Sequence, residues 1–165
     1  MKKALFAMMF LLVYPVGNVR PETYVTWDGL EADKLASIWL IQRFISPDAK
    51  IRLYPKGQTP GTGIQFDTPY SPIRRRFNQS TFESLLAHYH LSDPKLHSIA
   101  RLIHDIEINV WEKKVFQKTR EMEFFFMDLL SSSLEDKTII QKAGDYFDRL
   151  YQAVPDTMIQ QPKTK

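Results

Sequence analysis

The sequence predicts an α+β fold, a mostly helical single domain with a small sheet contributed by its N-terminal half. Three observations support this expectation. The 165 residues are enough for one domain with a real core. Short runs rich in β-branched and aromatic residues occur before residue 70, and apolar residues at helical spacing dominate after residue 80. Residues 33–47 are apolar around most of a helix circumference, so we expect a central helix packed from several sides.

Residues 1–18 have the pattern of a signal peptide. Lys2 and Lys3 are followed by an apolar stretch over residues 4–13, which is shorter than a membrane span. The region around residues 15–18 lacks a clean Ala-x-Ala site, so an uncleaved N-terminal anchor stays open as an alternative. We expect a periplasmic or secreted protein that meets a membrane only through this segment.

Charge and cysteine content narrow the function classes. The formal net charge is +3, of which Lys2 and Lys3 contribute +2, leaving +1 for the rest of the chain. Binding to nucleic acid depends on neutralising several phosphates, so no nucleic-acid partner is expected. The chain has no cysteine, which excludes disulfides, thiol nucleophiles and cysteine-ligated metal sites.

Three short strands are predicted in the first half. Residues 23–27 end at Asp28-Gly29, residues 49–54 alternate and end at Pro55, and residues 64–67 follow a loop rich in Gly and Pro. Between the first two strands lies the central helix, with Glu31 and Asp33 near its start and Pro47 at its end. Asp33 and Ser37 share one face of this helix. They form either a capping carboxylate beside a tolerated serine or part of a polar site.

Four helices are predicted in the second half. The first begins with a capping box over residues 80–83, and the second with Asp93 as N-cap and Pro94 in its first turn. A third covers about residues 120–130, and a fourth follows Ser133, with Asp136 placed to complete a cap. Residues 154–165 are polar without periodicity, so we expect a disordered tail.

A run of three arginines is the first candidate site. Arg74, Arg75 and Arg76 precede the helix that begins after Ser80. Guanidinium groups and a helix N-terminus together suit a tetrahedral anion such as sulfate, phosphate or chromate. The alternative is a solvated basic loop that pairs with Glu83 or Asp67.

A set of carboxylates is the second candidate site. Asp33, Asp67 and Glu107 come from three different predicted elements and would form a pocket if these pack together, with Arg43 or Arg75 opposite them. The alternative is three separate structural acids. His88, His90, His97 and His104 lack the spacing of a shared metal site, so no metal ligands are predicted.

Residues 33–49 resemble a motif of the C-terminal domain of ChrB-type chromate resistance proteins. The matching residues are Asp33, Ala36, Trp39, Leu40, Ile41, Arg43, Phe44, Ile45, Pro47 and Ala49. The likeness continues through residues 66–67, 81–83, 91–94 and 146–151 and implies a domain over residues 23–153. Ser37, Arg75 and Ser80 stand where the family usually has Cys, His and Cys, which argues against thiol chemistry or Cys/His metal binding here.

The resemblance implies a role in sensing or handling chromate. We expect an exported protein that binds an oxyanion in a stress or detoxification role, through Arg74, Arg75, Arg76, Ser80 and Arg43. A polar cluster of Asp33, Ser37, Asp67 and Glu107 would instead suit a metal- or carboxylate-dependent enzyme. A module that binds a protein partner is the third hypothesis. These hypotheses predict, in turn, converging arginines, converging carboxylates, and an exposed apolar patch. Neither a cofactor nor an oligomeric state is indicated by the sequence.

Overall fold

A computed structural model describes residues 21–109 and 114–155. Within these ranges the protein is an α+β domain, with a three-stranded sheet in the N-terminal half and helices that dominate the rest. The predicted signal peptide lies outside the described residues, and so does the predicted tail from residue 156 onward.

The sheet is parallel and has the order β2-β1-β3. The central strand β1 (Thr23–Trp27) pairs with β2 (Lys50–Tyr54) on one side and with the short β3 (Ile64–Gln65) on the other. All three predicted strands are present, although β3 is shorter than expected. Gly63, with a φ of 153°, leads into β3, and a Cβ there would lie 2.7 Å from the Thr23 carbonyl oxygen. Glycine therefore allows β3 to approach β1.

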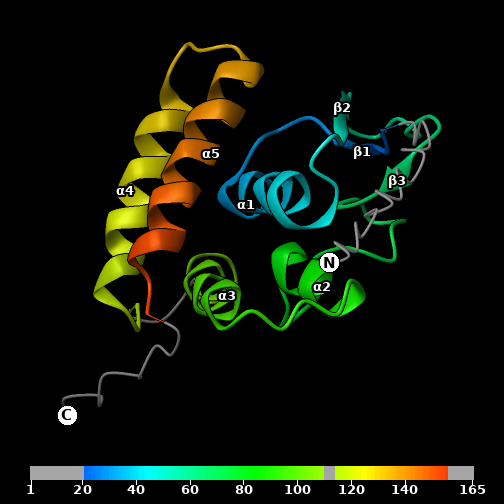
Figure 1. Ribbon diagram of the computed structural model, residues 1–165. Helices are drawn as coiled ribbons and strands as arrows, with labels where there is room; N and C mark the ends of the chain where they lie inside the picture. The colour runs from blue at the N-terminus through cyan, green and yellow to red at the C-terminus, as the bar shows by residue number, and fades with distance from the viewer. Residues whose placement is uncertain (1–20, 110–113, 156–165) are drawn as a thin grey trace, which may run out of the picture.

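The central helix is buried along its whole α-helical part. α1 (Ala32–Leu40) has no exposed residue, as its apolar circumference predicts. It continues as the π-helical segment η1 (Ile41–Ile45) and ends at Ser46, which is extended before Pro47. Figure 1 shows α1 at the centre of the molecule, between the sheet and the later helices.

Four helices follow the sheet, and three of them pack on α1. They are α2 (Thr81–His88), α3 (Pro94–Glu107), α4 (Gln117–Ser131) and α5 (Asp136–Ala153). α1 makes its most extensive helix contacts with α5 and α2, while α4 packs on the outside of α3 and α5 (Figure 1). No helix in the described ranges is both long and apolar enough to cross a membrane.

Helix starts follow the sequence signals in two cases and depart from them in two. The capping box of Ser80 and Glu83 and the N-cap of Asp93 are both formed. α4 begins at Gln117, about one turn before the predicted start. The predicted cap of α5 is wrong, because its N-cap is Glu135 and no side chain caps the helix. Local sequence alone does not choose between neighbouring start positions when packing stabilises the helix.

An aromatic cluster joins α1 to the C-terminal helix. The Trp39 ring stacks on Phe82 and packs against Phe147. Its indole Nε1 donates a 2.7 Å hydrogen bond to Asp148 of α5. Trp39 is 3% exposed, so the satisfied indole N–H lets a large ring fill the core without an unpaired donor.

Candidate functional site

Asp33 is a fully buried carboxylate that caps a distant helix. Its two oxygens accept hydrogen bonds from the backbone N–H of Thr81 (2.7 Å) and of Phe82 (2.9 Å), in the first turn of α2. Burial raises the pKa of Asp33 to about 7, although these two hydrogen bonds act in the opposite direction. The interpretation of Asp33 as a cap of its own helix is wrong, because it occupies the N-terminus of α2 instead.

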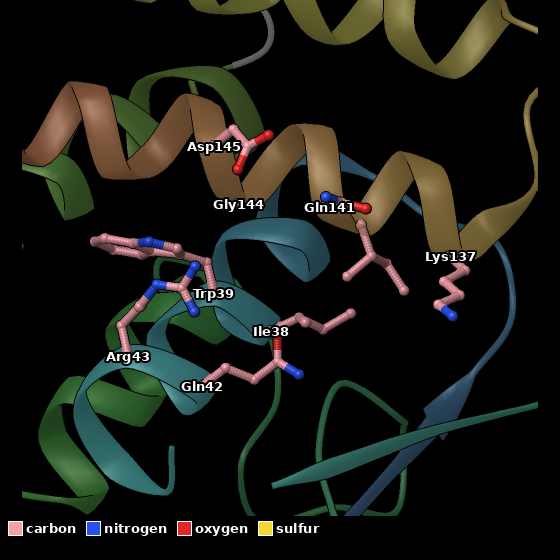
Figure 2. Close-up of a pocket in the computed structure, with 9 residues that line it drawn as sticks. Ile38, Trp39, Gln42, Arg43, Lys137, Gln141, Gly144 and Asp145 are labelled. Carbon is pink, nitrogen blue, oxygen red and sulfur yellow. The ribbon is translucent and has the colours of Figure 1, made fainter. Parts of the chain in front are cut away.

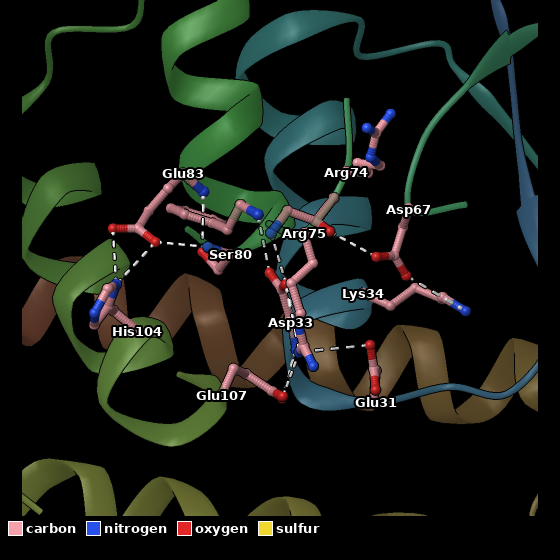
Figure 3. Close-up of polar contacts among 12 residues, drawn as sticks. Glu31, Asp33, Lys34, Asp67, Arg74, Arg75, Ser80, Glu83, His104 and Glu107 are labelled. Atoms are coloured by element: carbon pink, nitrogen blue, oxygen red, sulfur yellow. Dashed lines mark hydrogen bonds and ion pairs between the residues drawn. The ribbon is translucent and has the colours of Figure 1, made fainter. Parts of the chain in front are cut away.

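Arg75 lies against three carboxylates (Figure 3). Its Nη2 pairs closely with Glu107 and lies 3.6 Å from Glu31 and 3.7 Å from Asp33. We call these four residues the Arg75 centre. Burial raises the pKa of Glu31, and repulsion from Glu107 adds to this effect. Burial acts against the charge of Arg75, but its carboxylate partners outweigh it and raise the pKa of the guanidinium. The centre links the loop before α2 to α1 and α3.

Asp67 adjoins the Arg75 centre through Thr81. Its Oδ1 accepts a 2.6 Å hydrogen bond from the Thr81 hydroxyl, while its Oδ2 lies 3.5 Å from the Nζ of Lys34. The buried Lys34 ammonium also donates to the backbone carbonyls of Trp27, Asp28 and Gly29. The structure thus brings Asp33, Asp67 and Glu107 into one polar region, as the carboxylate hypothesis expects, around cations supplied by the chain itself.

The three arginines do not converge. Arg74 donates to the Ser71 carbonyl at 2.6 Å, and Arg76 donates to the Pro72 carbonyl at 3.5 Å. Figure 3 shows Arg74 directed away from Arg75. Of the triplet, Arg75 alone meets the carboxylates described above. The anion-binding N-terminus of α2 already holds the Asp33 carboxylate, and the Ser80 hydroxyl accepts from the Glu83 amide.

Arg43 lies elsewhere, on η1 against α5. Its Nε donates a hydrogen bond of 3.1 Å to one carboxylate oxygen of Asp148, and its Nη2 donates one of 3.0 Å to the other. Asp148 also accepts a hydrogen bond from the Trp39 indole. Arg43 borders a separate hollow between α1, η1 and α5 (Figure 2). It is therefore not part of the Arg75 centre.

Two residues of the polar region were missed by the sequence analysis as site residues. Glu31 and Lys34 contribute charges to this region, but their partners come from distant parts of the chain. A lysine within an otherwise apolar helix was the available signal for Lys34. No group of three or more His, Cys, Asp and Glu side chains within residues 21–109 and 114–155 is placed to hold a metal ion. His104 pairs instead with Glu83 at 3.1 Å.

Comparison with protein families identifies the domain. The family model described as ChrB, C-terminal domain, matches residues 24–154. The chain belongs to the ChrB C-terminal domain family. Membership relates it to chromate resistance. No curated protein and no solved structure matches the chain.

The departures of this ChrB domain from the expected family motif gather around one residue. Arg75 lies 3.7 Å from Asp33, and Ser80 directly precedes the Thr81 amide that Asp33 accepts from. Ser37 follows Asp33 by one helical turn, and its buried hydroxyl has no hydrogen-bond partner among the described residues. In this ChrB domain, the region around Asp33 therefore contains a permanent cation and two hydroxyl side chains.

Proposed function

We propose that the chain is an exported accessory protein of chromate resistance that binds a tetrahedral oxyanion, such as chromate or sulfate, through Arg75. The observation that carries this proposal is that the carboxylates around the Arg75 guanidinium bind it at unequal distances. Glu107 binds it closely, but the Glu31 carboxylate lies at 3.6 Å and is 44% exposed. The Nε of Arg75 is buried and has no hydrogen-bond partner among the described residues. A third of the Arg75 side chain is exposed, so solvent reaches part of this group.

The proposed binding step exchanges one carboxylate at the guanidinium for the oxyanion. An oxyanion replaces the loosely held Glu31 at the guanidinium and offers two oxygens to its planar donors. Asp33 and Glu107 stay in place, so the incoming anion is opposed by their charge. Because burial raises the pKa of Asp33 to about 7, the charge of this acid, and with it the opposition to the anion, weakens as the pH falls through this value. Binding is therefore expected to strengthen from pH 8 to pH 6.

Calorimetric titration with sulfate tests the proposal, since sulfate keeps its charge over this pH range. Arg75→Ala should abolish binding, and Glu31→Gln should strengthen it by removing the competing charge. Arg76→Ala is the matched control, because the side chain of this exposed arginine bonds only to the backbone carbonyl of Pro72 in the described part of the chain. Chromate and phosphate titrations then rank the anions. Absence of heat with all three anions, or binding retained in Arg75→Ala, would overturn the oxyanion proposal.

Export is a separate part of the proposal, and the signal-like pattern of residues 1–18 supports it. Cell fractionation with deletion of this segment tests it. A protein that stays in the cytoplasmic fraction with the segment intact would contradict export.

A partner-binding role is favoured by a different observation. A groove of about 890 Å³ runs between α4 and the start of α1, and Phe124 and Met127 at its edge are 66% and 64% exposed. A double substitution, Phe124→Ser with Met127→Ser, should leave the fold intact and weaken association with a protein partner. In the Arg75 centre the carboxylates converge on a guanidinium of the chain, which favours anion exchange at Arg75 over acid–base catalysis by these carboxylates.

A further inference from the structure

A second hollow lies between the first and last helices of the domain. It has a volume of about 320 Å³ and opens between α1, η1 and α5 (Figure 2). Ile38 and Trp39, which are 1% and 3% exposed, and the half-buried Ile140 supply its apolar surface. Its polar lining comes from Gln42, Arg43, Lys137, Gln141 and Asp145. An apolar surface with a few polar groups around it is typical of a small-ligand site.

Two unusual backbone features border this hollow. Gly144 stands inside the long helix α5, where glycine is less favourable than alanine. A Cβ at this position would meet no atom within 4 Å, so packing does not require glycine here. On the other wall, Gln42 and Arg43 belong to the π-helical segment η1, and π-helical turns are frequent at functional sites.

The polar groups of α5 follow a definite order. Lys137, Gln141 and Asp145 are four residues apart and line the hollow together. They present an ammonium group, a carboxamide and a carboxylate in succession. Figure 2 shows Lys137 and Asp145 toward opposite ends of the hollow, with Gln141 between them and Gln42 on the facing wall. Lys137 and Asp145 are eight residues apart, or about 12 Å along the helix.

The charges at the two ends are available to a ligand. Arg43 is already bound to Asp148 through Nε and Nη2. The side chains of Lys137 and Asp145 have no hydrogen bond or ion pair with another residue in the described part of the chain. Asp145 also interacts electrostatically with Arg43, but no ion pair joins the two side chains. The lining groups without a direct hydrogen bond or ion pair are thus one cation and one anion, which complement a zwitterion rather than a simple anion.

We propose that this hollow binds a short peptide, with a dipeptide as the best fit. The terminal carboxylate pairs with Lys137, the terminal ammonium pairs with Asp145, and the peptide group bonds to Gln141 and Gln42. An extended dipeptide spans about 7 Å, and an ion pair of about 3 Å at each end gives about 13 Å, close to the rise of about 12 Å along α5 between residues 137 and 145. The apolar surface of Ile38, Trp39 and Ile140 receives a side chain of the peptide.

Calorimetric titration of the full-length chain with alanyl-leucine tests this site. Lys137→Ala and Asp145→Asn should each weaken binding about tenfold, since each removes one charge-assisted contact. Lys142→Ala, on the same helix but outside the lining, is the matched control. N-acetylated and C-amidated forms of the peptide should show the same losses as the two variants.

Substitution of the glycine separates a site from a folding effect. Gly144→Ala should raise the melting temperature, because alanine favours the helix, and should nevertheless weaken peptide binding; Gly144→Leu should abolish it. Three results would each overturn the proposal. They are no heat with the peptide, equal binding by the Gly144→Leu variant, and tighter binding of a dicarboxylate of similar length.

Discussion

The carboxylate of Asp33 accepts a hydrogen bond from the backbone N–H of Thr81, 48 residues away in the sequence, so a side chain of the central helix caps the first turn of α2. This contact is fully buried, and Arg75 lies on its outer side. The strength of this hydrogen bond therefore depends on whether Asp33 is protonated and on the positive charge of Arg75 beside it.

The stability of the protein should depend on pH through Asp33. Burial raises the pKa of this acid from 3.8 to about 7, so the folded state holds its proton more tightly than the unfolded chain. The stabilisation of the folded state by protonated Asp33 is fully present below pH 4 and is lost as the pH rises through 7. Asp33→Asn should thus gain stability relative to the natural protein between pH 5 and pH 8. Urea unfolding at several pH values measures this difference, and two parallel pH profiles would contradict it.

Removal of Arg75 should destabilise the domain. Arg75→Ala leaves Glu107 and Asp33 without their cation, and both are largely buried. Because part of the guanidinium faces water, we expect a loss of about 2 kcal/mol in the free energy of unfolding, below the loss for a fully buried pair. Arg76→Ala should stay within about 0.5 kcal/mol of the natural protein. Equal losses in the two variants would show that the carboxylates do not depend on Arg75.

Two serines near Asp33 should respond in opposite directions to the same substitution. Ser80→Ala removes the N-cap of α2 and should cost about 1 kcal/mol. Ser37→Ala removes a buried hydroxyl that has no partner among the described residues, so it should be neutral or stabilising by up to about 1 kcal/mol. Thermal unfolding of both variants provides the comparison. A clear loss of stability in Ser37→Ala would indicate a hydrogen bond at this hydroxyl.

Substitution by alanine should cost very different amounts of stability at two glycines in the loop before β3. A Cβ on Gly63 would lie 2.7 Å from both the Thr23 carbonyl oxygen and a Val25 methyl group, and its φ is positive. Gly63→Ala should therefore cost about 2–3 kcal/mol, through steric overlap and backbone strain. At Gly61 the close neighbour is the hydroxyl end of Tyr54, which can move. Gly61→Ala should cost less than about 1 kcal/mol in the same denaturation experiment.

Asp148 should show the pH dependence opposite to that of Asp33. Its burial opposes ionisation, but hydrogen bonds from Arg43 and Trp39 outweigh it and lower the pKa. The stabilisation of the folded state by ionised Asp148 is present at pH values above 3.8, the ordinary pKa of an aspartic acid. It is lost as the pH falls through the lower pKa of the folded state. Asp148→Ala should cost about 1 kcal/mol at pH 7, since the acid is partly exposed. This cost should shrink in acid, and a constant cost would exclude ionisation as its source.

Features encoded by neighbouring residues could be predicted from the sequence. The strands before residue 70, the capping box at Ser80 and the N-cap at Asp93 all follow from groups a few residues apart. The burial of α1 follows from its apolar circumference. The hypothesis that Asp33, Asp67 and Glu107 meet also needed the packing of their elements, and the structure places them around Arg75 and Thr81.

Other features depend on contacts that no local pattern specifies. The role of Asp33 as a cap of α2 requires two helices to be placed within hydrogen-bonding distance. The three adjacent arginines looked like one basic group, but their backbone directs each guanidinium to a different acceptor. The change from α- to π-helix at Ile41 coincides with the packing of Arg43 and Trp39 against Asp148. Tertiary packing decides each of these outcomes.

The contact between α1 and α5 bears on when the domain can fold. Among the described helices, the fully buried α1 is made early in the chain, but a large part of the surface that covers it is supplied by α5, the last of them. Its parallel sheet likewise contains no hairpin that could form first. Synthesis must therefore be nearly complete before the core closes, and the growing chain stays open until then. The cover that α5 gives to α1 therefore makes the last described helix a condition for the buried state of the first one.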